Sequence, residues 1–188
     1  ETPLATGGAA GAAWGGAAAA AAARGQLAMV GFNYRRVPAV AYARRLLAEG
    51  RLGTQRHLRF TYLQDWLVDP EVPLTWRLRK EQAGSGALGD LGAHIVDLAQ
   101  YLAGERLVGV SALSETFVRE RPLLAGVATG PPGGGSGGAA GQEPARGEVT
   151  VDDAALFNGR LASGALASFE ATRMAAGRKN ALRFEING

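Results

Sequence analysis

The sequence contains no cysteine and only two histidines, His57 and His94. The lack of cysteine excludes disulfide bonds, thiolate zinc sites, iron–sulfur clusters and thiol nucleophiles. Two imidazoles are too few for a histidine-rich metal centre, so we predict no metal site. No run of about 18 large apolar residues is present, and Glu1 does not introduce a secretory signal. We therefore predict a soluble, cytoplasmic protein without a membrane partner.

Aromatic residues are scarce, at 7% of the chain, and the net charge is only +3. The hydrophobic residues, 47% of the total, still suffice for one sizeable core in 188 residues. Several arginines cluster between Arg35 and Arg59, but almost no aromatic residues are interleaved with them, as base stacking would require. We therefore predict no nucleic-acid partner.

Three patterns mark the first part of the chain. Leu4–Arg24 consists almost entirely of alanine and glycine, which predicts a poor helix because each interior glycine costs about 1 kcal/mol. The apolar run Leu27–Phe32 predicts a strand that is buried on both faces. Pro38 suits the first turn of a helix that runs to Glu49 and stops at Gly50. A helix followed by a buried strand is half of an α/β unit.

Strands outnumber helices in the remaining sequence. Polar and apolar residues alternate in Gln55–Leu63, which is the period of a half-buried antiparallel strand with His57 on its wetter face. An apolar stripe at helical spacing predicts a helix that ends at Gly104; its residues are Leu91, Ile95, Leu98 and Leu102. The glycine-rich tract 122–147 predicts a flexible surface loop. Further strands are predicted at Val108–Val118, Val149–Leu161, Ala165–Thr172 and Leu182–Ile186. The predicted fold class is α+β, with a predominantly antiparallel open sheet and helices packed on one face.

Asp90 and His94 are the sharpest chemical feature of the sequence. On the predicted helix they are four residues apart and share one face. A carboxylate near an imidazole raises its basicity and can orient it, which a general base acting on a hydroxyl requires. Gly92, between them, is unfavourable in a helix unless something approaches the backbone closely. The alternative is an ordinary surface ion pair at the start of a helix.

Gly84, Gly86 and Gly89 match the G-x-G-x-x-G pattern of dinucleotide-binding loops and precede a helix. That fingerprint requires a buried strand immediately before it, whereas residues 76–82 are charged. We therefore predict that these glycines do not cradle a phosphate. A Ser-His-Asp hydrolase is also disfavoured, because no G-x-S-x-G elbow follows a strand.

Several motifs together resemble one enzyme family. The most specific is Trp76-Arg77 followed by Ala83-Gly-Ser-Gly-Ala-Leu-Gly-Asp-Leu-Gly-Ala-His94-Ile-Val-Asp97. The others are Glu1-Thr-Pro-Leu4, which resembles E-K-P-L, and the segments 29–35, 50–53, 151–153, 169–173 and 177–180. On these motifs the chain resembles the Gfo/Idh/MocA family of NAD(P)-dependent oxidoreductases, and within it the inositol 2-dehydrogenase-like members.

The resemblance implies a two-domain enzyme of which this chain is a fragment. Residues 1–34 would be a remnant helix and strand from the end of a Rossmann domain. Residues 35–188 would be the substrate-binding and oligomerisation domain, truncated at its C-terminus. The implied substrate is a small polyhydroxy compound, a polyol or sugar, oxidised by hydride transfer to NAD or NADP. A homo-oligomer formed through the sheet is implied as well.

The resemblance also assigns roles to residues. His94 would take the proton of the substrate hydroxyl, and Asp90 would orient or assist it. The implied substrate-binding residues are Asn33, Arg35, Trp76, Arg77, Arg173 and Lys179, and the implied cofactor contacts are Glu1 and Pro3. For the six substrate-binding residues the alternative is a structural role as a core aromatic, surface ion pairs or a strand-end cap.

One departure from the family's pattern concerns catalysis. The family's catalytic lysine falls at Thr2, whose neutral hydroxyl cannot supply a cation to the reacting oxygen. We therefore expect this chain alone to be inactive, also because the cofactor domain is missing. The alternative function is a non-catalytic binding or oligomerisation module derived from that family.

Overall fold

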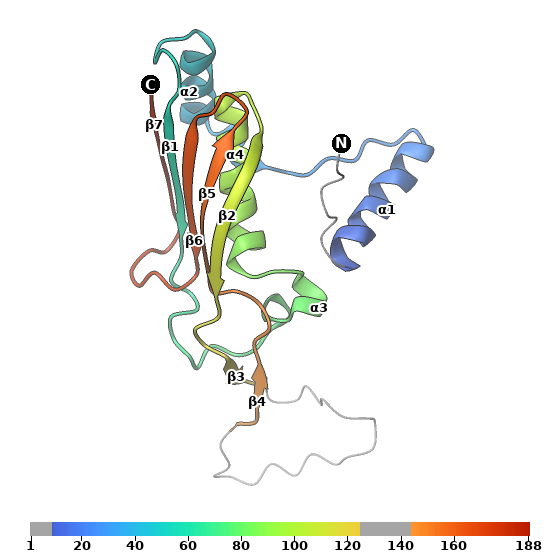
Figure 1. Cartoon of the computed structure of the whole chain (residues 1–188). Helices are drawn as coiled ribbons and strands as arrows, with labels where there is room; N and C mark the ends of the chain where they lie inside the picture. Colours follow the sequence, from blue (N-terminus) through green and yellow to red (C-terminus); the bar gives the residue numbers. More distant parts are fainter. Residues whose placement is uncertain (1–8, 125–143) are drawn as a thin grey trace.

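The computed structural model describes residues 9–124 and 144–188. Its largest feature is a sheet of five strands in the order β2-β5-β6-β1-β7 (Figure 1). These strands are β1 His57–Leu63, β2 Leu107–Glu115, β5 Ala154–Leu161, β6 Leu166–Thr172 and β7 Ala181–Asn187, while β3 Glu120–Pro122 and β4 Arg146–Glu148 form a separate pair. The helices are α1 Ala9–Ala23, α2 Pro38–Ala48, α3 Lys80–Ala83 and α4 Ala93–Ala103, with short helical turns η1 Asn33–Arg36, η2 Trp76–Leu78 and η3 Leu88–Gly92.

Strand β1 lies between β6 and β7, which follow each other along the chain. Because β6 and β7 run in opposite directions, a strand between them must be parallel to one and antiparallel to the other. β1 is parallel to β6 and antiparallel to β7, and the remaining neighbours in the sheet are antiparallel. The predominantly antiparallel sheet is thus confirmed. The parallel partner of β1 was not predicted, because alternation reports which side is buried and not the direction of the neighbour.

One face of the sheet carries the core. Leu58, Phe60 and Tyr62 of β1 are buried on this face, as their period of two predicts. Helices α2 and α4 lie against the same face (Figure 1) and complete the core with Val40 and the apolar stripe of α4. The prediction that helices pack on one face is therefore confirmed.

A ladder of four phenylalanines crosses the sheet beneath these helices. Phe157, Phe169, Phe60 and Phe184 lie opposite one another on neighbouring strands. Their ring centroids are 4.6, 5.7 and 5.8 Å apart, and their planes are nearly parallel. Such pairs contribute about 0.5–1.5 kcal/mol each beyond the area that they bury. The ladder therefore helps to fix the register, since a slip of one residue would turn a ring to the other face.

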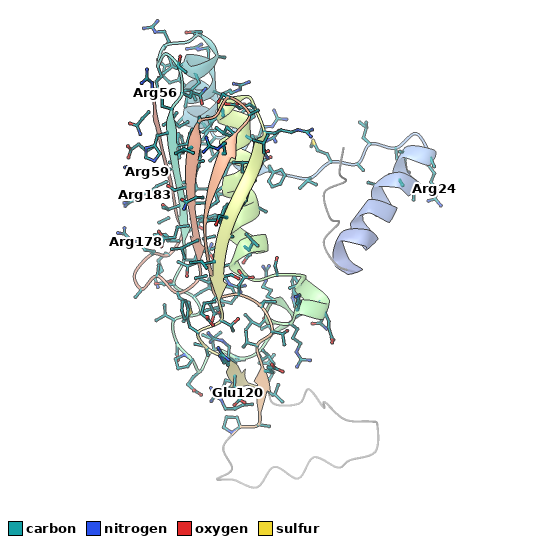
Figure 2. All side chains as sticks on the ribbon, in the orientation of Figure 1. Arg24, Arg56, Arg59, Glu120, Arg178 and Arg183 are labelled. Carbon is teal, nitrogen blue, oxygen red and sulfur yellow. The ribbon has the colours of Figure 1, made fainter. Side chains whose placement is uncertain are left out.

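The opposite face of the sheet is open. Alternation along β1 places His57 and Arg59 on this side, and Arg59 pairs with Glu185 at 3.5 Å. Figure 2 shows Arg59 and Arg183 along the edge formed by β1 and β7. Three exposed leucines share the open face; they are Leu113, Leu156 and Leu166.

The two predicted amphipathic helices are confirmed. α2 begins at Pro38. The predicted stripe is buried throughout, with Leu91 in η3 and its other residues in α4, which ends before Gly104. Gly104 has φ 78°, the left-handed conformation that glycine adopts most readily. The predicted poor helix is present as α1. Among the helices of the described residues, none combines the length and apolar character that crossing a membrane requires.

One prediction of local structure is wrong, and the bounds of another differ. Leu27–Phe32 forms no strand, and Leu27, Met29 and Val30 are exposed. A strand needs a neighbour that accepts its backbone hydrogen bonds, and no strand of the described residues pairs with this segment. The predicted flexible loop 122–147 overlaps at its ends with β3 and β4, which pair with each other. Residues 125–143 of that loop lie outside the described residues.

Candidate functional site

Asp152 fixes the start of the helical segment that carries Asp90 and His94. Its two carboxylate oxygens accept hydrogen bonds from the backbone N–H groups of Gly86 and Leu88, both at 2.7 Å. A carboxylate at this end also interacts favourably with the positive end of the helix dipole. The helical path then passes through the π-helical turn η3 before α4 begins. Single π turns within helices are frequent at functional sites.

This carboxylate stands where a phosphate would bind in a dinucleotide-binding loop. The N–H groups of Gly86 and Leu88 could donate to a phosphate, but they donate to Asp152 instead. The geometry agrees with the prediction that this glycine motif does not cradle a phosphate. The described residues therefore do not fit a dinucleotide at this motif. The predicted cofactor contacts, Glu1 and Pro3, lie outside the described residues.

The carboxylate of Asp90 lies between two arginines. Its Oδ1 is 3.5 Å from Nη1 of Arg77, and its Oδ2 is 3.9 Å from Nη1 of Arg173. Within the described part of the chain, no hydrogen bond or ion pair joins Asp90 to His94. Neither a direct orienting contact nor a simple ion pair between these two side chains is therefore observed. The physical reason is that two guanidinium groups are stronger partners for a carboxylate than an imidazole.

Three aromatic rings surround the imidazole of His94. Their centroids lie 5.3 Å away for Tyr34, 5.8 Å for Phe32 and 6.2 Å for Tyr62. Nδ1 of His94 is buried and has no hydrogen-bond partner among the described residues. A buried polar atom without a partner is unfavourable. The imidazole as a whole is only half-buried, so a group that enters from outside can meet its accessible part.

The two tyrosines, Tyr34 and Tyr62, belong to a polar cluster that was not predicted from the sequence. The Tyr62 hydroxyl donates to Oδ1 of Asn180 at 2.8 Å and lies 2.7 Å from the Tyr34 hydroxyl. Gln64 Nε2 donates to the same Oδ1 at 2.9 Å, and Trp66 Nε1 donates to Gln64 Oε1 at 2.9 Å. Burial, followed by the hydrogen bond to Tyr34, raises the pKa of Tyr62 above its ordinary value. The only signal in the sequence was a tyrosine on the apolar side of an alternating strand.

Trp76 and Arg77 border a cavity of about 170 Å³ beside Asp90. Trp76 is 56% exposed, which contradicts the alternative role of a core aromatic. The Arg77 guanidinium lies 4.9 Å from its ring centroid. Arg173 also borders this cavity, but its side chain is only 1% exposed. The structure thus brings Trp76, Arg77, Arg173 and Asp90 together.

The remaining predicted substrate contacts lie in other surroundings. Arg35 donates two hydrogen bonds to the carboxylate of Asp97, one of them from Nε at 2.8 Å, and this hydrogen bonding raises the pKa of Arg35. Lys179 is exposed and pairs with Asp65 at 2.9 Å. Asn33 opens η1 and borders a separate cavity of about 520 Å³. Arg35 and Lys179 thus each form an ion pair, and Arg35 also borders the cavity of Asn33.

Together these observations define an α+β domain with a site suited to proton transfer. The half-buried imidazole of His94 and the carboxylate of Asp90 are four residues apart along one helical segment, on the side of the sheet that α4 covers. An imidazole can take up and release a proton near neutral pH. Trp76 and the charged side chains of Arg77 and Asp90, which border the same cavity, suit a polar organic substrate.

The chain belongs to the GFO/IDH/MocA family, because residues 40–188 match the GFO/IDH/MocA C-terminal domain. The levoglucosan dehydrogenase of Pseudarthrobacter phenanthrenivorans is 49% identical over 160 residues, which are 85% of this chain and 40% of the relative. The family predicted from the motifs is confirmed.

Solved structures of oxidoreductases have the same fold. The oxidoreductase domain protein from Kribbella flavida has a TM-score of 0.76 and 59% identity, covering 92% of this chain and 42% of its own. Levoglucosan dehydrogenase in complex with NADH and levoglucosan has a TM-score of 0.72 and 44% identity, covering 87% and 38%. The chain thus spans about 40% of the length of its curated relative.

Proposed function

We propose that this chain supplies the proton-transfer and substrate-binding part of an NAD(H)-dependent sugar or polyol dehydrogenase. The observation that carries the proposal is the half-buried imidazole of His94, which lies among aromatic rings four residues after Asp90 on the same helical segment. The similarity to levoglucosan dehydrogenase, which forms a complex with NADH and levoglucosan, supports this reaction class.

In the proposed reaction, His94 accepts the proton of the substrate hydroxyl while the hydrogen on the same carbon leaves as hydride. Asp90 accepts a hydrogen bond from a hydroxyl of the bound substrate. A bound nicotinamide would supply the acceptor for this hydride. Because the glycine motif of residues 84–89 does not fit a dinucleotide, we assign the binding of the dinucleotide to other residues. Glu1 and Pro3 remain predicted contacts.

We infer a substrate with several hydroxyl groups. The exposed ring of Trp76 can pack against the C–H face of a sugar, while Arg77 and Asp90 offer a donor and an acceptor beside it. The similarity to levoglucosan dehydrogenase favours an anhydrosugar such as levoglucosan. The motif resemblance keeps an inositol as the second candidate. Further predicted contacts are Asn33, Arg35 and Lys179.

We propose that the open face of the sheet binds a second copy of the chain. Exposed Leu113 and Leu156 lie opposite each other on β2 and β5, beside charges of both signs such as Arg59 and Glu185. A face with apolar groups and both charges can be complementary to itself in a twofold dimer. Leu156→Glu should lower the mass measured by light scattering. An unchanged mass would contradict this interface.

The catalytic proposal is tested with the protein in its natural full length. NADH formation is followed with NAD+ and, in turn, levoglucosan, myo-inositol and glycerol. We expect turnover with one of the two cyclic compounds and far less with glycerol, which is too small to fill the site. If the protein binds NADH but turns over none of the polyhydroxy compounds tested, the proposal is contradicted.

Thr2 favours a second candidate, a non-catalytic binding or assembly module, because the family's lysine falls at this position. Thr2→Lys in the same protein separates the two. Restored hydride transfer would count against the module. Absent hydride transfer despite bound cofactor would support it.

A further inference from the structure

Arg173 is a buried cation behind the proposed site. Its side chain is 1% exposed, and Nη2 donates to the backbone oxygen of Asp152 at 2.9 Å. Its guanidinium lies 5.4 Å from the ring centroid of Trp66. Burial lowers the pKa of this guanidinium, and the carboxylate of Asp90 opposes that effect most strongly. A buried charge without a counter-charge is strongly unfavourable, so the choice of counter-charge matters.

Three carboxylates are close enough to influence Arg173. Two of them already accept backbone hydrogen bonds, although Oδ1 of Asp153 has no partner among the described residues. Asp152 accepts two backbone N–H groups at the start of the helical segment. Asp153 accepts two more, from the segment after β2, at 2.8 and 3.0 Å. Within the described residues, Asp90 is the carboxylate that forms an ion pair with Arg173.

The helix start leaves this guanidinium little freedom to move. A Cβ built on Gly86 would lie 2.6 Å from Nη2 of Arg173 and 1.8 Å from the backbone oxygen of Asp152. The guanidinium is therefore packed against the same backbone that leads into η3. The other oxygen of Asp90 faces Arg77, which is half exposed. A fixed cation on one side and a mobile one on the other define the orientation of this carboxylate.

We propose that Arg173 is a positioning residue that holds the Asp90 carboxylate in its substrate-facing orientation without touching the substrate itself. This inference rests on the proposed function, because the orientation matters only if Asp90 binds the substrate. It replaces the direct substrate contact that the family resemblance implied for Arg173.

Arg121 provides a matched control. It is also an arginine and fully buried, but it donates to the backbone oxygens of Leu67 and Asp69 and forms no ion pair with a carboxylate among the described residues. Replacing it removes a buried guanidinium of the same size without changing the partner of Asp90.

The kinetic test uses the natural full-length protein with NAD+ and levoglucosan or, if that is the better substrate, myo-inositol. Arg173→Met should lower kcat about 100-fold with KM changed less than about threefold, because a misplaced group mainly affects the transition state. Arg173→Lys should recover about tenfold of that loss, since lysine restores the positive charge but not the planar guanidinium with its several N–H donors. Arg121→Met should keep the kcat of the folded protein. Equal kcat losses in Arg173→Met and Arg121→Met would overturn the proposal.

A second measurement separates this inference from the proposed function. Thermal unfolding is compared for Asp90→Asn, Arg173→Met and the double variant, independently of turnover. We expect Asp90→Asn to lower the Tm in the wild-type background and to have little effect beside Arg173→Met, because the buried cation is then gone. Additive Tm shifts would overturn the inference even if the enzyme is active. Non-additive shifts in a protein without turnover would support the ion pair and contradict only the proposed function.

Discussion

Gly86→Ala should destabilise the protein through a clash at the start of the helical segment that carries Asp90 and His94. The added methyl group would lie 1.8 Å from the backbone oxygen of Asp152, far inside a normal contact. That oxygen accepts hydrogen bonds from the N–H of Ala87 and from Nη2 of Arg173, both at 2.9 Å. Separating the two segments loses about 1 kcal/mol for the neutral bond and about 1.5–3 kcal/mol for the charge-assisted one. The smaller backbone entropy of unfolded alanine returns up to about 1 kcal/mol.

The expected net loss is therefore about 1.5–4 kcal/mol, which corresponds to a fall in Tm of about 3–16 °C for a domain of this size. Thermal unfolding followed by circular dichroism measures it. Gly109→Ala is the control, because no atom lies within 4 Å of the position of its Cβ. That variant should stay within about 0.5 kcal/mol of the wild type. If Gly86→Ala unfolds at the same temperature as Gly109→Ala, the packing at the helix start is not as described.

Three further perturbations test other parts of the structure. Asp152→Asn should lower the free energy of unfolding by about 1.5–3 kcal/mol, because the amide nitrogen of Asn cannot accept one of the two backbone hydrogen bonds. The control is Asp69→Asn at an exposed position that accepts one backbone hydrogen bond, and it should lower the free energy of unfolding by less than about 1 kcal/mol. Phe60→Ala, at the centre of the ladder, should cost about 3–5 kcal/mol in urea unfolding with an unchanged m value, and a loss below about 1 kcal/mol would refute the ladder's role. The hydrogen bond from Lys179 holds the pKa of Asp65 in the folded protein below its ordinary value. The pair therefore stabilises the fold at any pH above the ordinary pKa, and this stabilisation is lost as the pH falls through the lower pKa of the folded state. The Tm difference between wild type and Lys179→Met should accordingly be present at neutral pH and vanish in acid. A Tm difference that does not change with pH would contradict the stabilising role of this pair.

Local patterns predicted the parts of the fold that local forces determine. The alternation in β1 and the stripe in α4 each report which side of one element is buried, and both are confirmed. The same logic failed for Leu27–Phe32, because an apolar run indicates the need for burial and does not supply a partner. The direction of β1 depends on how β6 and β7 are placed around it, which no local period encodes.

For the site, too, the sequence predicted the local spacing of residues but not their contacts with distant segments. Spacing alone brought Asp90 and His94 to one helix, but their actual partners come from distant segments. Tyr34 meets Tyr62 across 28 positions, and Tyr62 meets Asn180 across 118. The burial of Arg173 behind Asp90 likewise arises from packing between the end of β6 and the helix start. Such contacts are decided by tertiary structure, and propensity and spacing carry no information on them.

The most direct test of the account is the role of His94 as the base. His57, the second histidine, lies on the open face of the sheet and serves as the matched control. In the natural full-length protein, His94→Gln should lower the kcat for NAD+ reduction by about 100-fold or more with NADH binding unchanged, while His57→Gln should keep the wild-type rate. Wild-type turnover in His94→Gln would contradict the account.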